Sequence, residues 1–229
     1  HIMDQRTSIC SFGSPEQGLM AVAMVQMAHF YGFPVYINVG ITDSKLLDVQ
    51  AGLEKGMTMI MGALAGADTF GHAGICGTDH AASLPWLLID NEMMAYTKRI
   101  MGGFEVNEEM LAVEVIKSVG PGGDFLSQLH TVEHFRQELW FPSPVWTRDT
   151  WEAWEAKGCQ GMGERAWQEV QRILSRHAPE PMDEDMAREI DAIVDAAKRH
   201  LKQGAQRELC LSHAPRRGRG IDGHIGHYL

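Results

Sequence analysis

The chain has 229 residues, of which 45% are hydrophobic and 22% are charged. These proportions fit an ordinary globular protein that is long enough for one sizeable core. Twenty Lys and Arg residues against thirty Asp and Glu residues give a formal net charge of −10. An acidic surface repels phosphate backbones, so we expect no nucleic-acid partner. The sequence contains no run of about 18 apolar residues, so we predict no membrane-spanning helix and no membrane partner.

The cysteines are widely spaced and form no CxxC pair: they are Cys10, Cys76, Cys159 and Cys210. This spacing favours free thiols in a reducing compartment, so we expect a cytoplasmic protein. The first three residues lack the charged and apolar regions of a signal peptide. We interpret residues 1–3 as a cloning remnant and leave them out of the predicted fold.

Two strand–helix units are predicted at the start of the chain. Residues 9–12 form a short apolar strand, and Pro15 opens a helix that Gly32 closes. Residues 35–39 form a second strand, and a second helix follows the polar loop 41–45. Residues that recur at helical spacing, nearly all of them apolar, are Leu19, Val22, Ala23, Gln26, Met27 and Phe30 in the first helix. Met57, Ile60, Met61 and Leu64 form an apolar stripe in the second.

Two more strands are predicted further along, at residues 69–71 and 125–126. Between them an apolar pattern runs to Met101, and Asn107 is placed to cap a helix that ends near Val119. The remaining sequence is helical in character. A capping box that starts at Asp149 opens one helix, and helices are also predicted over residues 163–176 and 183–200.

Strands separated by helices of this length predict an α/β fold with a parallel sheet. Four βα units make about half of a (β/α)8 TIM-barrel-like fold, whose usual length is about 250 residues. We therefore expect a half-barrel over residues 4–148, C-terminal helices over 149–202 and a disordered tail over 203–229. A half-barrel leaves two open strand edges, and a homodimer is the partner that we favour.

The polar loop after the second strand is the first candidate site. Side chains at the carboxyl ends of parallel strands face the ligand in this kind of architecture. Asp43, Lys45 and Asp48 supply charged acceptors and a donor there. The alternative is that Asp43 or Ser44 caps the next helix, while Lys45 and Asp48 pair on its surface.

Three further groups are candidates for chemistry. His72 stands between glycines at the end of the third strand, where it is either an acid–base residue or a structural histidine. Asp90 and Glu92 are two residues apart, so on a helix they point about 200° apart and cannot bind one ion together. His130 and His134 have a metal-ligand spacing, but the HExxH order is absent and a polar surface network is favoured.

A set of short strings in this order and spacing resembles the trimethylamine methyltransferase family, including its non-pyrrolysine, glycine-betaine-type branch. The resemblance runs from about Gly13 to about Pro181 and lacks the family's amino-terminal half. The strings are residues 40–45, 48–52, 63–68, 88–92, 119–123, 130–131 and 140–142, together with Arg148.

The resemblance implies a methyltransferase that moves a methyl group from a tertiary or quaternary amine to the Co(I) corrinoid of a separate carrier protein. The corrinoid stays with that partner, and we expect no cofactor or metal bound directly. A quaternary nitrogen cannot accept a hydrogen bond, so carboxylates and aromatic faces must hold it. The implied catalytic residues are His72 and Glu92, and the implied substrate-binding residues are Tyr36, Asp43, Lys45, Asp48 and Phe70.

Two other hypotheses remain open. The first is a truncated, non-catalytic fragment of such an enzyme that folds and dimerises without doing chemistry. The second is a metal-dependent barrel hydrolase that would use His72, His80, His130 and His134.

Overall fold

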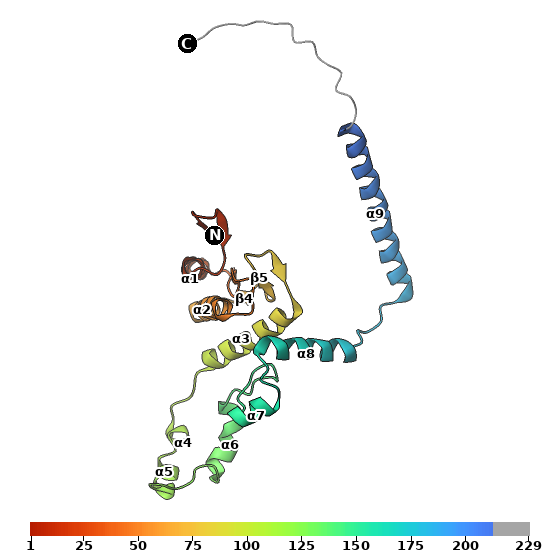
Figure 1. Cartoon of the computed structure of the whole chain (residues 1–229). Coiled ribbons are helices and arrows are strands. Elements are labelled where there is room, and N and C mark those ends of the chain that lie inside the picture. The colour runs from red at the N-terminus through yellow and green to blue at the C-terminus, as the bar shows by residue number, and fades with distance from the viewer. Residues whose placement is uncertain (213–229) are drawn as a thin grey trace, which may run out of the picture. The chain divides into compact units, whose positions relative to one another are not determined.

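The computed structural model describes residues 1–212, with side chains as far as Lys202. The chain divides into two units, His1–His177 and Ala178–Leu229 (Figure 1). Within residues 1–212, the helices are all too short or too polar to cross a membrane.

The first unit begins with a β-hairpin. Strand β1 (Ile2–Asp4) pairs antiparallel with β2 (Ile9–Ser11). Helix α1 (Pro15–Phe30) follows, because the Ser14 side chain accepts a hydrogen bond from the Gln17 N–H and Pro15 fits the first helical turn. The hairpin includes two of the three residues that the sequence analysis left out of the fold.

A single parallel strand pair lies at the centre of the unit. Strand β3 (Tyr36–Ile37) pairs with β4 (Thr69–Phe70), in a register that sets Tyr36 opposite Thr69. Helix α2 (Val49–Ala65) joins them and ends at Gly66, whose φ of 89° is the left-handed conformation that glycine adopts easily. These elements form the one βαβ unit of the described chain.

The predicted half-barrel is not confirmed, because the described residues hold three two-stranded sheets in a helix-dominated α/β fold. The predicted first strand pairs with β1 and not with the parallel pair. The third sheet is an antiparallel hairpin of β5 (Ile75–Cys76) and β6 (Ala81–Ala82). Residues 125–126 form a turn and not a strand, because the Asp124 carboxylate accepts the N–H groups of Leu126 and Ser127.

The predicted helices are largely confirmed. Asn107 caps a helix as predicted, but Ala112 has a φ of 48° and divides that helix in two. The cap of the next predicted helix is Thr150 and not Asp149, since the Thr150 side chain accepts the Ala153 N–H. The helices after β6 are α3 (Leu84–Gly102), α4 (Glu108–Leu111), α5 (Val113–Val119), α6 (Leu129–Glu138), α7 (Trp151–Ala156) and α8 (Met162–Arg176).

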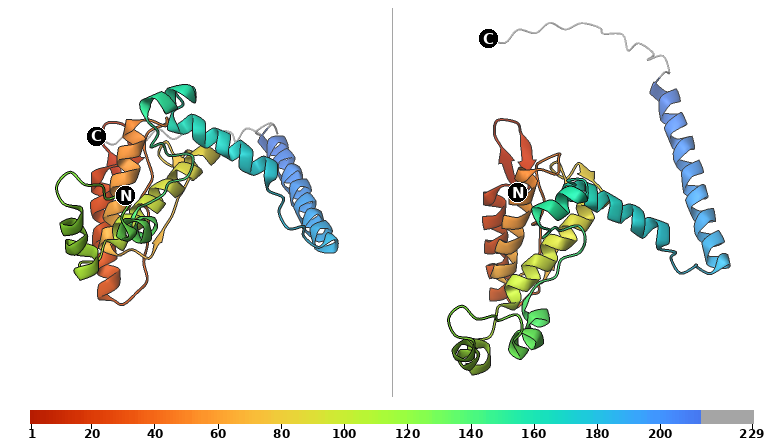
Figure 2. Two further views of the ribbon diagram at one scale, coloured as in Figure 1. Left: turned by 90° about the horizontal axis from the view of Figure 1, so that it is seen from below. Right: turned by 60° about the horizontal axis from the view of Figure 1, so that its bottom comes forward.

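Helices α1 and α2 lie side by side and α3 packs against α8 (Figure 2). One apolar cluster joins α1 to β3 through Val25, Ile37 and Val39. Another joins α3 to α8 through Ile89 and Ala166, with Val145 between them.

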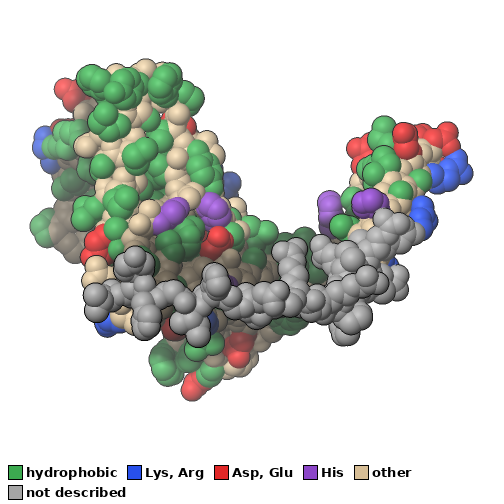
Figure 3. All heavy atoms as spheres, turned by 90° about the horizontal axis from the view of Figure 1, so that it is seen from above, with side chains coloured by type: hydrophobic (Ala, Val, Ile, Leu, Met, Phe, Trp, Pro, Cys, Tyr) green, Lys and Arg blue, Asp and Glu red, His purple; other side chains and the backbone are tan. Residues whose placement is uncertain are grey.

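The apolar stripes predicted for α1 and α2 are not their buried faces. Leu19 and Phe30 on α1, and Leu64 on α2, are each more than 60% exposed. Hydrophobic side chains accordingly cover much of the surface of this unit (Figure 3). Both helices are apolar on more than one side, so periodicity alone cannot identify the packed face. The buried residues are Gln17, Gly18, Ala21 and Val25 on α1, and Ala51, Lys55, Thr58, Met59 and Gly62 on α2.

The second unit contains helix α9 (Glu184–Ser212). Asp183 caps it as predicted, because its Oδ1 atom accepts the N–H groups of Asp185 and Met186. The helix continues past residue 202, where the sequence analysis ended the helical segment. The rest of the predicted tail, residues 213–229, lies outside the described residues.

Candidate functional site

The loop after β3 starts at Gly40, which two side chains of α2 hold from both sides. The Gly40 N–H donates to Thr58 Oγ1 at 3.0 Å, and the Gly40 carbonyl accepts from Lys55 Nζ at 2.8 Å. Gly40 has a φ of 75°, so the chain turns sharply here at little steric cost. Helix α2 therefore fixes where this loop leaves the strand.

Glu54 on α2 holds the next residues of the loop. Its Oε2 atom accepts the Thr42 hydroxyl at 2.6 Å and the Asp43 N–H at 2.8 Å, while Oε1 accepts the Gln50 amide at 2.8 Å. Three donors on one carboxylate restrict both of its oxygen atoms to one orientation. Glu54 is therefore a fixed acceptor beside the loop.

Asp43 connects this loop to the turn between β2 and α1. Its carboxylate accepts the N–H groups of Phe12 at 2.9 Å and Gly13 at 3.3 Å, and also the Ser11 hydroxyl. A Cβ atom at Gly13 would collide with the Glu54 carboxylate in its present position, so glycine allows the two segments to approach this closely. Lys45 folds back over the same loop and donates from Nζ to the Asp43 carbonyl at 2.7 Å.

These groups border a cavity of about 710 Å³. Asp43, Lys45 and Glu54 supply its charged wall, together with the paired Asp4 and Arg6 of the hairpin. The apolar wall comes from Ile9, Leu53, Met57 and Met61. The cavity thus places fixed carboxylates and two cationic side chains beside thioether and aliphatic groups.

Tyr36 and His72 form a separate pair outside this cavity. The Tyr36 hydroxyl lies 3.1 Å from His72 Nδ1, and it crosses directly over Gly71, where a Cβ would collide with it. His72 has a φ of 71°, an uncommon conformation for a residue with a side chain. Ile37 and Val39 pack toward the helices while Tyr36 is 54% exposed, so the pair lies on the uncovered side of β3 and β4.

The remaining predicted site residues lie elsewhere. Phe70 packs against the apolar cluster of α1 and β3. Asp48 caps α2, and its bond from the Ala51 N–H holds the pKa of its carboxyl below the ordinary value. Glu92 is buried and accepts the Ser143 N–H at 3.2 Å. Of the predicted residues, the structure thus brings Asp43 and Lys45 together in one cavity and Tyr36 and His72 together outside it.

Lys55, the largest fully buried side chain among the described residues, was not predicted from the sequence. Its Nζ atom lies 2.8 Å from Asp90 Oδ2 and 5.0 Å from the centre of the Trp86 ring. Burial raises the pKa of Asp90, and the Lys55 ammonium opposes that shift. The available signal was helical spacing, because Lys55 lies four residues from both Ala51 and Met59 on the buried face of α2.

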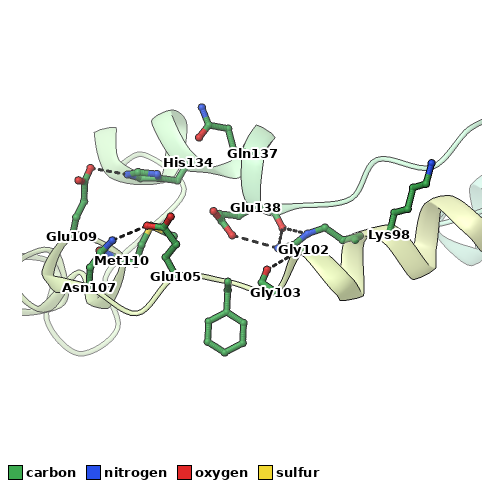
Figure 4. A pocket seen from close by; sticks show the side chains of 12 residues that line it. Lys98, Gly102, Gly103, Glu105, Asn107, Glu109, Met110, His134, Gln137 and Glu138 are labelled. Atoms are coloured by element: carbon green, nitrogen blue, oxygen red, sulfur yellow. Dashed lines mark hydrogen bonds and ion pairs between the residues drawn. The ribbon is translucent and has the colours of Figure 1, made fainter. Parts of the chain in front are cut away.

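A second cavity, of about 450 Å³, lies between the end of α3, α4 and α6 (Figure 4). Its charged groups mostly bind one another: Arg99 contacts Glu138, and His134 Nε2 lies 3.1 Å from Glu109 Oε1. His130 and His134 do share a helix face, with ring centres 4.4 Å apart. No cluster of three potential metal ligands is found within the described residues.

Comparison with known proteins identifies relatives of the chain. The sequence model of the family described as trimethylamine methyltransferase (MTTB) matches residues 1–202. A trimethylamine methyltransferase of Methanosarcina mazei is 38% identical over 203 residues, which are 88% of this chain and 40% of the relative. For a trimethylamine methyltransferase of Desulfitobacterium hafniense the identity is 37% over 85% of this chain and 39% of the relative.

A glycine betaine methyltransferase of Desulfitobacterium hafniense is 34% identical over 84% of this chain and 40% of the relative. The chain thus spans about 40% of the length of the relatives that it matches. The family match also starts earlier and ends later than the resemblance seen in the sequence. The chain belongs to the trimethylamine methyltransferase family.

Proposed function

We propose that this chain takes part in moving a methyl group from a tertiary or quaternary amine, trimethylamine or a glycine-betaine-like compound, to the Co(I) corrinoid of a separate carrier protein. The observation that carries the proposal is the family match over residues 1–202, together with relatives named for these two amines. We state the relatives' activity as a proposal for this chain, because the chain covers about 40% of their length.

The cavity at the loop after β3 supports an amine substrate. A quaternary ammonium group has a charge but no hydrogen-bond donor or acceptor, so nearby carboxylates and apolar contacts must bind it. The same groups would bind protonated trimethylamine, whose single N–H can donate to a carboxylate. Asp43 and Glu54 supply carboxylates that other hydrogen bonds already hold in place. Met57 and Met61 offer polarisable apolar surface for the methyl groups.

The side chains of this chain would contribute little to the bond-making and bond-breaking steps. The corrinoid of the carrier would supply the nucleophile that accepts the methyl group. The carbon–nitrogen bond of the quaternary or protonated ammonium group breaks, and its electron pair stays on the nitrogen, which leaves as a neutral amine with one methyl group fewer. The residues of this chain would hold the amine and keep water from it, which are positional and electrostatic tasks. Lys45 would bind the carboxylate of a betaine-like substrate.

A spectroscopic assay tests the proposal. The protein is mixed with reduced cobalamin and with either trimethylamine or glycine betaine, and loss of the Co(I) absorbance is followed. We expect protein-dependent methylation with at least one amine, and a rate lowered about tenfold or more by Glu54→Gln, equal to at least about 1.4 kcal/mol in the barrier. Glu152→Gln, an exposed change on α7, is the control and leaves the rate unchanged.

A non-catalytic fragment is the second candidate, and the strand pair favours it. Strands β3 and β4 pair only with each other within residues 1–212, so each has one open edge. This hypothesis predicts a folded protein that neither binds an amine, by calorimetry, nor methylates cobalamin. That result with both amines would reject the methyltransferase proposal.

The homodimer that we favour would have twice the 25.5 kDa chain mass in sedimentation equilibrium.

A further inference from the structure

We propose that Lys55 and Asp90 are a positioning pair, which sets the loops after β3 and β4 in the geometry that the candidate site requires. Neither residue lines the cavity or contacts Tyr36 or His72. The pair instead joins four parts of the unit: helix α2, helix α3 and the two loops. Its consequence for methyl transfer rests on the proposed function, whereas its effect on the loops does not.

Each N–H donor of the Lys55 ammonium group has a partner. Its ammonium group donates to the Gly40 carbonyl and to Asp90 Oδ2, both at 2.8 Å, and lies over the face of Trp86. The side chain has 0% exposure, so no water competes for these contacts. Two directional bonds and one aromatic face account for the three N–H donors of a lysine.

Asp90 extends the connection to the second loop. Its Oδ2 atom accepts the Gly74 N–H at 2.7 Å in addition to Lys55 Nζ. Gly74 stands two residues after His72, and its own φ of 84° marks a turn in the chain. Lys55 and Asp90 therefore hold the backbone at Gly40 and at Gly74, one on each strand-end loop.

The turn between β5 and β6, which follows the second loop in the chain, is also bound directly to the loop after β3 near the cavity. The Gly77 N–H donates to the Ser44 carbonyl at 2.8 Å, and the Thr78 N–H donates to the Thr42 carbonyl at 3.2 Å. Thr78 lines the same cavity as Asp43 and Lys45. A shift at Gly40 or Gly74 would therefore move groups that border the cavity.

Energetics favour a positional role over a simple stabilising one. Burying two charges costs desolvation free energy that their attraction does not always repay, and apolar pairs of similar volume are often at least as stable. Asp90 Oδ1 is buried without a hydrogen-bond partner, which is a further cost. If stability alone mattered, two hydrophobic residues would serve at least as well as this pair. Hydrophobic residues, however, cannot bind the Gly40 carbonyl or the Gly74 N–H.

The test uses the double variant Lys55→Met/Asp90→Leu beside the single variant Lys55→Met. Removing one partner leaves an unpaired buried charge, so we expect the single variant to unfold at a much lower urea concentration and the double variant to recover most of that loss. Amide hydrogen exchange at Gly74 is then measured in each folded protein. We expect exchange at least about tenfold faster in the double variant than in the original chain, because its acceptor is gone.

Two controls make this result specific. Ile89→Ala removes a buried side chain next to Asp90 that packs toward Val145 and Ala166, so it lowers global stability without a selective change at Gly74. Asp90→Asn keeps an oxygen acceptor and should keep Gly74 exchange within about threefold of the original. If the double variant does not fold, Asp90→Ala takes its place: Gly74 exchange at least about tenfold faster than in Asp90→Asn supports the role, and equal exchange in the two overturns it.

The results that would overturn the positioning role differ from those that would overturn the proposed function. Unchanged Gly74 exchange in the double variant, or equal exchange in the double variant and in Asp90→Asn, would overturn the positioning role whatever the enzyme assay shows. Where the original chain methylates cobalamin, we also expect the double variant to lose at least about tenfold in kcat while remaining folded. Full activity in that variant would likewise overturn the proposal.

Discussion

The loop after β3 and the α4–α6 segment both carry acidic residues, yet their carboxylates do different things. Asp43 in the loop and Glu54 beside it on α2 are partly buried, and each accepts three hydrogen bonds. In the α4–α6 segment, Glu109 is 69% exposed at its side chain and contacts His134. Charge in the first region fixes the backbone, whereas charge in the second forms side-chain pairs that water can reach.

Hydrogen-bond partners, and not residue type, therefore decide how much a charged group contributes to stability. An exposed ion pair contributes about 0–1 kcal/mol, because water and salt screen it. A partly buried carboxylate that satisfies backbone N–H groups contributes more, since its removal leaves those groups unpaired. Substitutions in matched positions of the two regions can test this contrast.

Asp43→Ala should show the largest effect. It leaves the Phe12 and Gly13 N–H groups and the Ser11 hydroxyl without an acceptor, so we expect a loss of about 3 kcal/mol in the free energy of unfolding. Urea denaturation measures it. Asp124→Ala is the matched control, because Asp124 accepts two N–H groups in an exposed turn, where water can replace the carboxylate, and should cost clearly less. Equal losses in the two variants would contradict the contrast.

Thr58→Val should come next. Valine has nearly the shape of threonine but cannot accept the buried Gly40 N–H, so we expect a loss of about 1–3 kcal/mol. Thr58→Ser keeps the hydroxyl and should be less destabilising than Thr58→Val. The comparison is made from urea midpoints at constant slope. A serine variant less stable than the valine variant would show that methyl packing and not the hydrogen bond matters here.

Helix positions could be predicted from the sequence to a large extent, because capping is local. Asn107 and Asp183 both cap helices where the sequence placed them. The Asp149 prediction was one residue early, since Thr150 competes for the same role and its side chain accepts the Ala153 N–H. Strand pairing could not be predicted as well, because it depends on distant segments: residues 9–12 were predicted as part of the parallel sheet, but β2 pairs with β1.

The candidate site was predictable only in part. The loop of Asp43 and Lys45 was found because strand ends are general sites for ligands in α/β folds. Lys55 was missed because a lysine on a helix is usually solvated, and its partner Asp90 lies 35 residues away in sequence. Glu92 was predicted to act on substrate, but its burial and its bond to the Ser143 N–H depend on tertiary packing. Its proposed catalytic role stays a prediction.

Thr150→Ala tests the same contrast, between a side chain that binds a backbone N–H and an exposed ion pair, with a smaller expected effect. Losing the hydrogen bond to the Ala153 N–H should cost about 1 kcal/mol in the free energy of unfolding of the first unit. Asp149→Ala breaks an exposed pair with Lys157 and an exposed hydrogen bond from the Thr147 hydroxyl, and it should cost less than the Thr150 change because water competes for both. Thermal or urea unfolding followed by circular dichroism compares the two. A larger loss from Asp149→Ala would restore Asp149 as the cap.

Asp4 should show the smallest effect on folding and the clearest effect on titration. The Arg6 side chain donates to its carboxylate at 2.7 Å and lowers the Asp4 pKa from 3.8 to about 2. Because the folded-state pKa is lowered, any stability from this pair is present above pH 3.8 and is lost as the pH falls toward 2. NMR titration of the carboxyl carbon should give a midpoint near 2 in the original chain. In Arg6→Met the midpoint should rise toward 3.8, and a midpoint that does not move would mean that the backbone N–H groups of the turn, and not the arginine, lower the pKa.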